Sequence, residues 1–191
     1  NLAATDQMLD SPTNNFCTFN PLFKSRLGIG NGNLQLSEGN LKASQNISQW
    51  DTSDSTISLP STGKWYFETE IVSKDSGDLF IGLDSQVQEA NISNVLGWRD
   101  SGEFYFNGST SVSYSTYTVG DIIAIRVDMD TGAVYIAKND VWQNSGASVK
   151  TIDTTLGYVF AVSAYTSNAS VVANFGQDSS FAGNKTAQGN A

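Results

Sequence analysis

Residues 120–142 read GDIIAIRVDMDTGAVYIAKNDVW, the clearest strand pattern in the chain. In the first half of this stretch, apolar side chains alternate with Arg126 and Asp128. Successive side chains of a strand point to opposite faces, so this period of two predicts one buried face and one solvated face. Turn residues follow at 130–132 (DTG) and again at 139–140 (ND). We therefore predict a β-hairpin that packs on a core.

Similar alternation recurs along the rest of the chain. It predicts strands at 34–36, 41–44, 56–59, 64–71, 79–83, 95–98, 103–107, 111–114, 158–165 and 170–175. Within 64–71 the pattern places Trp65 on the buried face, and 48–55 reads as a polar loop. No stretch of about ten residues has convincing helical spacing. About a dozen short strands separated by turns are typical of an antiparallel β-sandwich and not of a βαβ fold.

The length of 191 residues suits a single domain. We expect a connector and first edge segment at 1–22, the sandwich at 23–177, and a polar tail or linker at 178–191. The chain opens at Asn1 without Met or a leader, and we interpret it as a piece of a longer protein.

Composition argues against several functional classes. Ten basic residues against 19 acidic ones give a net charge of -9, which repels nucleic acids and anionic membranes. No apolar run approaches the roughly 20 residues of a membrane-spanning helix, so we expect no membrane insertion. The chain has no histidine, the commonest general base and metal ligand, and Cys17 is its single cysteine. We therefore expect neither catalysis nor a cofactor or metal.

Four blocks of sequence, 63–71, 96–108, 120–140 and 158–177, resemble SPRY domains. The phrases DSPTNNFCTFNPL and LSEGNL, at 10–22 and 36–41, are most similar to SPRY-like structural proteins of marine tailed bacteriophages. The resemblance implies a concanavalin-like β-sandwich of two curved antiparallel sheets. It also implies binding of peptide, protein or glycan through loops at one end, without a cofactor.

One position departs from the family pattern. Asn139-Asp140 stands where an Asn-Gly turn is usual, which requires a positive φ at an aspartate. We expect a slightly longer loop at this position.

The function that this resemblance implies is a non-enzymatic module on the surface of a bacteriophage virion. It would form part of a tail fibre, spike or capsid decoration that adheres to a host-surface glycan or protein, or to other virion proteins. Many copies on one particle would supply avidity, and a homo-oligomer is compatible with this role. An alternative is a cellular SPRY module that binds a short peptide.

Aromatic residues in turns and at strand ends are the candidate ligand contacts, because their rings stack on sugars and anchor peptides. Trp50 lies in the polar loop and Trp142 follows a tight turn, so both are expected to be exposed. The full candidate set is Trp50, Trp98, Arg99, Tyr105, Tyr114, Tyr117 and Trp142. For any one of them, packing against a cross-strand neighbour is the simpler explanation.

Two acidic patterns offer further alternatives. Glu68 and Glu70 share one strand face, as do the paired acids of concanavalin-like glycan hydrolases, but a third acid of that pattern would fall on Val72. An exposed strand face, on which the like charges are solvated, is the simpler explanation of the pair. The loop pairs Asp51/Asp54, Asp75/Asp78 and Asp128/Asp130 could each contribute oxygens to Ca²⁺, although aspartate is common in turns for local reasons.

Overall fold

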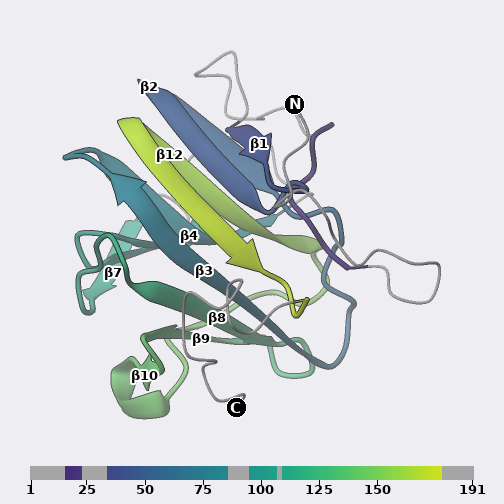
Figure 1. Ribbon diagram of the computed structural model, residues 1–191. Helices are drawn as coiled ribbons and strands as arrows, with labels where there is room; N and C mark the ends of the chain where they lie inside the picture. The colour runs from purple at the N-terminus through teal and green to yellow at the C-terminus, as the bar shows by residue number, and fades with distance from the viewer. Residues whose placement is uncertain (1–15, 23–33, 86–94, 107–108, 178–191) are drawn as a thin grey trace.

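The computed structural model describes residues 16–22, 34–85, 95–106 and 109–177 (Figure 1). The predicted tail at 178–191 and most of the predicted connector lie outside these residues, as do Asn107 and Gly108, where a hairpin turn is expected between the predicted strands 103–107 and 111–114. Within the described ranges, no helix has the length and apolar character needed to cross a membrane.

Antiparallel strands make up more than half of the described chain. They are β1 (Gln35–Ser37), β2 (Lys42–Asp54), β3 (Lys64–Lys74), β4 (Asp78–Ser85), β5 (Val95–Arg99), β6 (Glu103–Phe106), β7 (Ser109–Ser113), β8 (Ile122–Asp128), β9 (Ala133–Lys138), β10 (Val141–Trp142), β11 (Lys150–Thr151) and β12 (Tyr158–Asn174). A short 3₁₀ turn, η3 (Asn144–Gly146), follows β10. The hydrogen-bonded order is β10-β9-β8-β3-β12-β4-β5-β6-β7, with β2 also on β12, β1 on β2 and β11 on β9.

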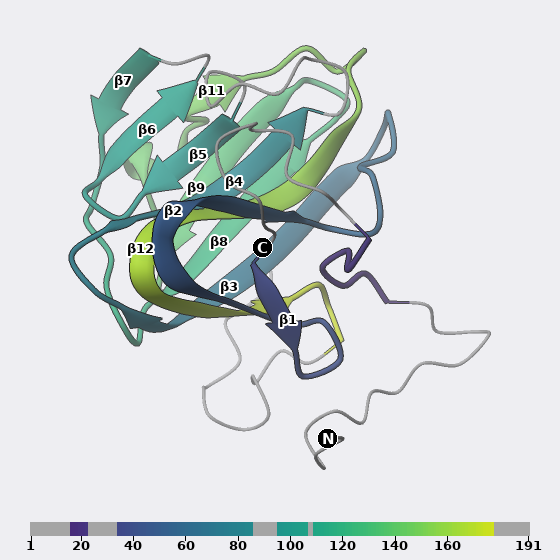
Figure 2. The same ribbon diagram turned by 90° about the horizontal axis from the view of Figure 1, so that it is seen from above.

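One long strand joins the two layers of this sheet. The first half of β12 pairs with β4, and its second half pairs with β3. Between the halves the register against β2 shifts, at Tyr165/Thr166 and Thr166/Ala169. Irregularities of this kind bend a strand, and Figure 2 shows β12 and β2 curving together. The sheet thereby folds over itself, and the all-β, antiparallel prediction is confirmed.

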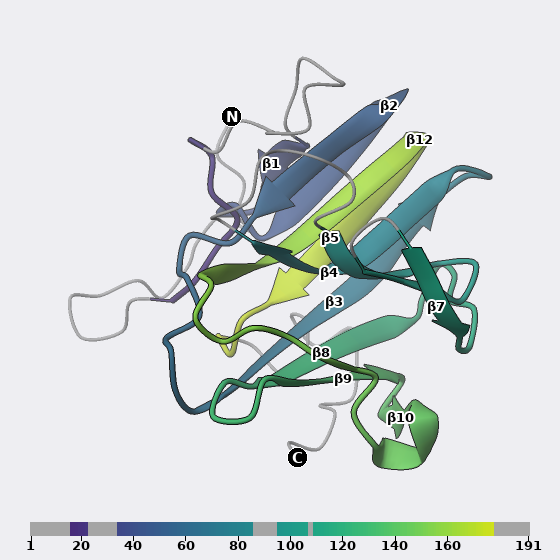
Figure 3. The ribbon, with the colours of Figure 1, turned by 180° about the vertical axis from the view of Figure 1, so that it is seen from behind.

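The core lies between the layer of β4, β5 and β6 and the layer of β3, β8 and β9; Figure 3 views both from behind. Its largest fully buried side chains are Trp98, Phe19, Phe67, Phe104, Ile71, Leu79, Ile81, Leu83, Ile123, Ile125, Met129 and Ile136. Complete burial of one such aliphatic or aromatic side chain stabilises a fold by about 1.5–3 kcal/mol. The alternation of β8 follows directly, because Ile123 and Ile125 face this core.

The predicted hairpin is present as β8 and β9, with Ile125 opposite Ile136. The next turn joins β9 to β10 through two residues, since Val141 pairs with Lys138. Asn139 and Asp140 have φ angles of 48° and 63°, the left-handed values that a two-residue hairpin turn requires. The positive φ at Asp140 is confirmed, whereas the longer loop expected here is wrong.

Three predicted boundaries are wrong. Residues 48–55, predicted as a loop, belong largely to β2; residues 56–59, predicted as a strand, lie outside every strand; and 158–165 and 170–175 are parts of one strand, β12. Polar residues misled the prediction in β2 because Asp51, Thr52 and Ser53 are strand residues whose side chains are nonetheless buried. Pairing with β12 outweighs the weak intrinsic strand preference of Asp51.

Trp65 and Glu68 of β3 also differ from expectation. Trp65 has the predicted phase, opposite Val127, but it is near the start of β3 and remains 36% exposed, with its indole N–H donating to the Thr62 carbonyl. Glu68 faces away from the core cluster yet is only 3% exposed, so it does not belong to a solvated face.

The N-terminal part of the described chain contributes to the core. Phe19 forms an isolated bridge with Ser55 and is fully buried. Its ring packs edge-on against Phe175 at a centroid distance of 5.7 Å. Part of the segment predicted as a connector therefore closes the sandwich.

Candidate functional site

Four aromatic rings form a continuous cluster, which we call the aromatic patch: Trp50, Phe80, Tyr105 and Tyr165. The centroid of Trp50 lies 5.3 Å from that of Tyr165 and 5.5 Å from that of Phe80. Phe80 in turn meets Tyr105 edge-on at 5.2 Å. Tyr165 is 43% exposed and Phe80 only 6%. The cluster is therefore accessible at Tyr165 and buried at Phe80.

Strand register explains why residues far apart in sequence meet here. Tyr165 of β12 pairs with Trp50 of β2 on one side and with Asp78 of β4 on the other. Their neighbours in the alternation, such as Leu79 and Ala164, belong to the core cluster, whereas the patch residues do not. The aromatic patch therefore lies on the outer face of the layer.

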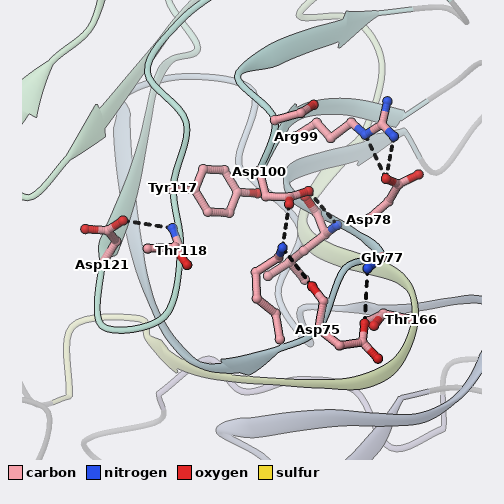
Figure 4. Close-up of polar contacts among 12 residues, drawn as sticks. Asp75, Gly77, Asp78, Arg99, Asp100, Tyr117, Thr118, Asp121 and Thr166 are labelled. Carbon is pink, nitrogen blue, oxygen red and sulfur yellow. Dashed lines mark hydrogen bonds and ion pairs between the residues drawn. The ribbon is translucent and has the colours of Figure 1, made fainter.

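Arg99 connects the aromatic patch to two acidic side chains. Its side chain donates to Asp78 Oδ1 through Nε and Nη2, to Glu103 Oε2 at 2.8 Å and to the Tyr105 hydroxyl at 3.2 Å (Figure 4 shows the Asp78 contact). Its guanidinium carbon also lies 5.9 Å from the centre of the Phe80 ring. Burial works against the charge of Arg99, but the hydrogen bond and attraction from Asp78 outweigh burial and raise its pKa.

The β3–β4 turn supports the patch from the side. Gly77 lies so close to β12 that a Cβ at this position would collide with the backbone of Tyr165 and Thr166. Asp75 holds the turn: it accepts a hydrogen bond from the Gly77 N–H at 3.1 Å (Figure 4) and another from the Ser167 hydroxyl. The Ser167 and Gly77 bonds favour the carboxylate and lower its pKa. Glycine at position 77 thus allows the β3–β4 turn to pack closely against β12 at Tyr165.

A second ion pair ties the same turn to the end of β5. Lys74 Nζ lies 2.8 Å from Asp100 Oδ2 and donates to the Asp75 carbonyl, while Asp100 Oδ1 accepts the Leu79 N–H (Figure 4). The Lys74 and Asp100 side chains are 14% and 13% exposed. Because each has further hydrogen bonds, the pair tolerates its partial burial. We assign this pair a structural role.

The structure brings together three of the seven candidate residues, Trp50, Arg99 and Tyr105. Trp98 and Tyr117 instead lie in the core, 0% and 3% exposed, with ring centroids 5.4 Å apart. The Tyr117 hydroxyl donates to the carbonyls of Leu79 and Trp98. Both residues therefore support the surface from beneath, and neither belongs to the patch.

The other two candidates lie apart from the patch. Tyr114 packs edge-on against Phe104. Trp142 pairs with Ala137 at the opposite edge of the sheet order, where the guanidinium of Arg126 lies over its ring at 4.6 Å and over that of Tyr135 at 4.1 Å.

The acidic alternatives are occupied by local contacts. The buried carboxylate of Glu68 accepts hydrogen bonds from the Tyr66 hydroxyl at 2.6 Å and from the Asn174 amide at 3.1 Å. Burial, and then the bond to Glu68, raise the pKa of Tyr66. Asp128 and Asp130 accept backbone N–H groups of the hairpin turn and of Gly63. Among the described residues, no three acidic, Cys or His side chains gather as a metal site would require.

Sequence reasoning missed Phe80, Tyr165 and Glu103, and it named Asp78 only as a possible calcium ligand. Tyr165 has the same phase as Ser163 in β12, away from Ala164, so a search for aromatic residues out of phase with the core could have found it. Its neighbours on β2 and β4 could not be found, because pairing between distant strands is not written in the local pattern.

Comparisons with known proteins identify the architecture. A family model described as the SPRY domain matches residues 64–178. Ran-binding protein 9 of Xenopus tropicalis is 30% identical over 126 residues, 60% of this chain and 22% of the relative. The Ran-binding proteins 9/10 homolog of Drosophila melanogaster is 28% identical over 131 residues, 63% of this chain and 13% of the relative. The chain thus spans at most about a fifth of the length of these relatives.

The structure is similar to that of the SPRY domain of human HERC1. The TM-score is 0.68 at 19% sequence identity, and the match covers 84% of this chain and 99% of that chain. The predicted SPRY-type sandwich is therefore confirmed.

The same matches correct the functional prediction. A tail-fibre, spike or capsid module of a bacteriophage, located on the virion and adhering to host glycan, is wrong, because the matched relatives are animal proteins named for binding Ran. The matches do not support the resemblance to bacteriophage proteins. They support the alternative, a cellular SPRY module.

Proposed function

Because the chain belongs to the SPRY family, whose domains are protein-interaction modules, we propose that it is a non-enzymatic protein-binding module that docks its partner on the aromatic patch. The observation that carries this proposal is the exposed ring of Tyr165, 43% accessible and held in contact with Trp50. Tyrosine and tryptophan are enriched among the residues that dominate binding energy at protein interfaces.

The patch is suited to binding because it is already ordered. Each ring packs on another ring, and the contacts of Arg99 fix Tyr105. Side chains held in place before binding lose little conformational entropy when a partner arrives.

Selection from a surface-displayed library of random dodecapeptides tests the docking surface. We expect enriched peptides to bind the wild-type protein and to lose at least about tenfold in affinity for Tyr165→Ala, as for a central aromatic contact. Trp65→Ala is the matched control, because Trp65 is exposed to a similar degree but belongs to β3 and not to the patch. Absence of enrichment, or equal binding to Tyr165→Ala, would contradict the proposal.

Purified Ran is a second probe, because the names of the matched relatives state that they bind it. The matched segment is a minor part of those proteins, so binding of Ran by this chain is itself a proposal. We expect Ran, if bound, to compete with the enriched peptides for the patch.

The absence of catalysis is also part of the proposal. Its support is the chemistry around Glu68, whose carboxylate is 3% exposed and already accepts two hydrogen bonds. A glycan hydrolase needs both acids in contact with the sugar. We expect incubation with β-glucans and algal polysaccharides to release no reducing ends; release that Glu70→Gln abolishes would show an enzyme instead.

A further inference from the structure

The charge around the aromatic patch is unbalanced. Arg99 contacts two carboxylates, and each uses only one of its oxygens: Asp78 accepts through Oδ1, and Glu103 accepts from Arg99 and Ser101 through Oε2. Within the described part of the chain, Asp78 Oδ2 and Glu103 Oε1 accept no hydrogen bond. These side chains are 28% and 36% exposed. One guanidinium therefore faces two acids, with an oxygen of each still available.

The position of Asp78 places this negative charge beside the exposed rings. Asp78 is the direct cross-strand partner of Tyr165, which pairs with Trp50 on its other side. Directly opposed residues in an antiparallel pair have Cβ atoms about 4.5–5.5 Å apart. A cationic side chain over Tyr165 would meet both a ring face and a carboxylate, and both attract cations.

Most positive groups that could receive an acidic ligand are already engaged. Among the described residues, Lys42, Lys74, Arg99 and Lys138 form ion pairs, Arg126 and Lys150 lie over aromatic rings, and only Lys64, exposed at the start of β3 and outside the patch, has neither kind of contact. The chain as a whole has a net charge of -9. An acidic partner would approach a surface of its own sign, whereas a basic partner would be attracted to it.

We infer that the segment docked on the aromatic patch is basic, with an arginine or lysine that lies against Tyr165 and Trp50 and forms an ion pair with Asp78. This inference rests on the proposed function and specifies the chemistry of its partner. Its charge would balance the second acid beside Arg99, and flanking apolar groups of the same segment would cover the rings.

The displayed dodecapeptide library separates this inference from the proposal beneath it. We expect enriched sequences to contain an arginine or lysine whose replacement by glutamine weakens binding by about tenfold, as for a close interfacial charge pair. Acidic or uncharged peptides that still require Tyr165 would overturn the inference and leave the docking surface intact. Peptides indifferent to Tyr165→Ala would overturn both.

A matched pair of variants distinguishes a local contact from general attraction. Asp78→Asn and Asp153→Asn change the net charge equally, but Asp153 is exposed at a turn between β11 and β12 and contacts Thr155. We expect Asp78→Asn to weaken an arginine-containing peptide by about tenfold and Asp153→Asn to have little effect. Equal losses in both would overturn the inference. Should Asp78→Asn fail to fold, Glu103→Gln replaces it with the same expected direction.

Discussion

Arg99 and Arg126 occupy similar positions in the two layers of the sandwich, yet their surroundings differ. Each lies on an outer face beside aromatic rings: Arg99 near Phe80 and Tyr105, and Arg126 over Tyr135 and Trp142. Arg99 also forms two ion pairs, whereas Arg126 forms none with the described residues.

The difference shows what distinguishes a docking surface from a stabilised strand face. Arg126 bridges the β8–β9–β10 hairpins, whose members are close in sequence. The Arg99 network joins β4, β5 and β6 beside the exposed ring of Tyr165, so it combines an available carboxylate oxygen with an accessible ring. An arginine beside an aromatic residue is therefore insufficient evidence of a site; exposure and charge balance make the distinction.

The largest expected effect tests whether Trp98 is core and not surface. Trp98→Ala should lower the free energy of unfolding by about 3–5 kcal/mol, because it removes a fully buried indole from the layer of β4, β5 and β6, which carries the aromatic patch. Urea denaturation, monitored by circular dichroism, measures this change in the free energy of unfolding. Trp65→Ala, at the exposed start of β3, should cost less than about 1 kcal/mol. Equal effects of the two changes would contradict the assignment of Trp98 to the core.

Gly77 provides a more local test of whether the β3–β4 turn positions the aromatic patch. A Cβ at this position meets the backbone of Tyr165 and Thr166, so Gly77→Ala should destabilise the protein by about 1–3 kcal/mol and also weaken peptide binding by displacing Tyr165. The same denaturation and binding measurements apply. The neighbouring exposed change Ser76→Ala should leave both unchanged. Normal binding by Gly77→Ala would mean that the turn does not position the patch.

Replacement of each arginine sharpens the comparison directly. Arg99→Met should cost about 1–2 kcal/mol, because it leaves Asp78 and Glu103 as uncompensated like charges. The loss should shrink at high salt, which screens their repulsion. Arg126→Met should cost about 0.5–1 kcal/mol with little dependence on salt, since it removes only contacts with rings. Identical salt dependence in both variants would show that the two surroundings are equivalent.

The smallest expected effect concerns the pH dependence of stability that Asp121, immediately before β8, contributes. Although burial favours the neutral form of Asp121, the Thr118 N–H, the Asn139 amide and Lys138 outweigh it and lower its pKa (Figure 4 shows the Thr118 contact). A depressed folded-state pKa stabilises the fold above the ordinary value of 3.8, and this contribution is lost as pH falls through the folded-state pKa.

We expect Asp121→Asn to flatten the decline in unfolding free energy below pH 3.8 by roughly 1 kcal/mol or less. Urea titrations at a series of acidic pH values measure it. An unchanged slope in the variant would show that Asp121 does not contribute to acid sensitivity.

Prediction from the sequence succeeded where the signal was local. The β8–β9 hairpin and the phase of β3 were readable because side chains alternate at a period of two within each strand. Trp65 shows the limit of that signal, since its phase was right but its position near the start of β3 leaves it exposed. For the site, Trp50, Arg99 and Tyr105 were named individually, without any indication that they meet.

Alternation and turn chemistry act over a few residues, so they specify an antiparallel β-sandwich with a SPRY-like hairpin without reference to distant parts of the chain. Which aromatic residues reach the surface depends instead on how distant strands pack together. The bend of β12 brings Tyr165 between Trp50 and Asp78, which lie 115 and 87 positions before it in the chain. Strand pairing at such separations depends on the packing of both layers as a whole, and no local pattern specifies it.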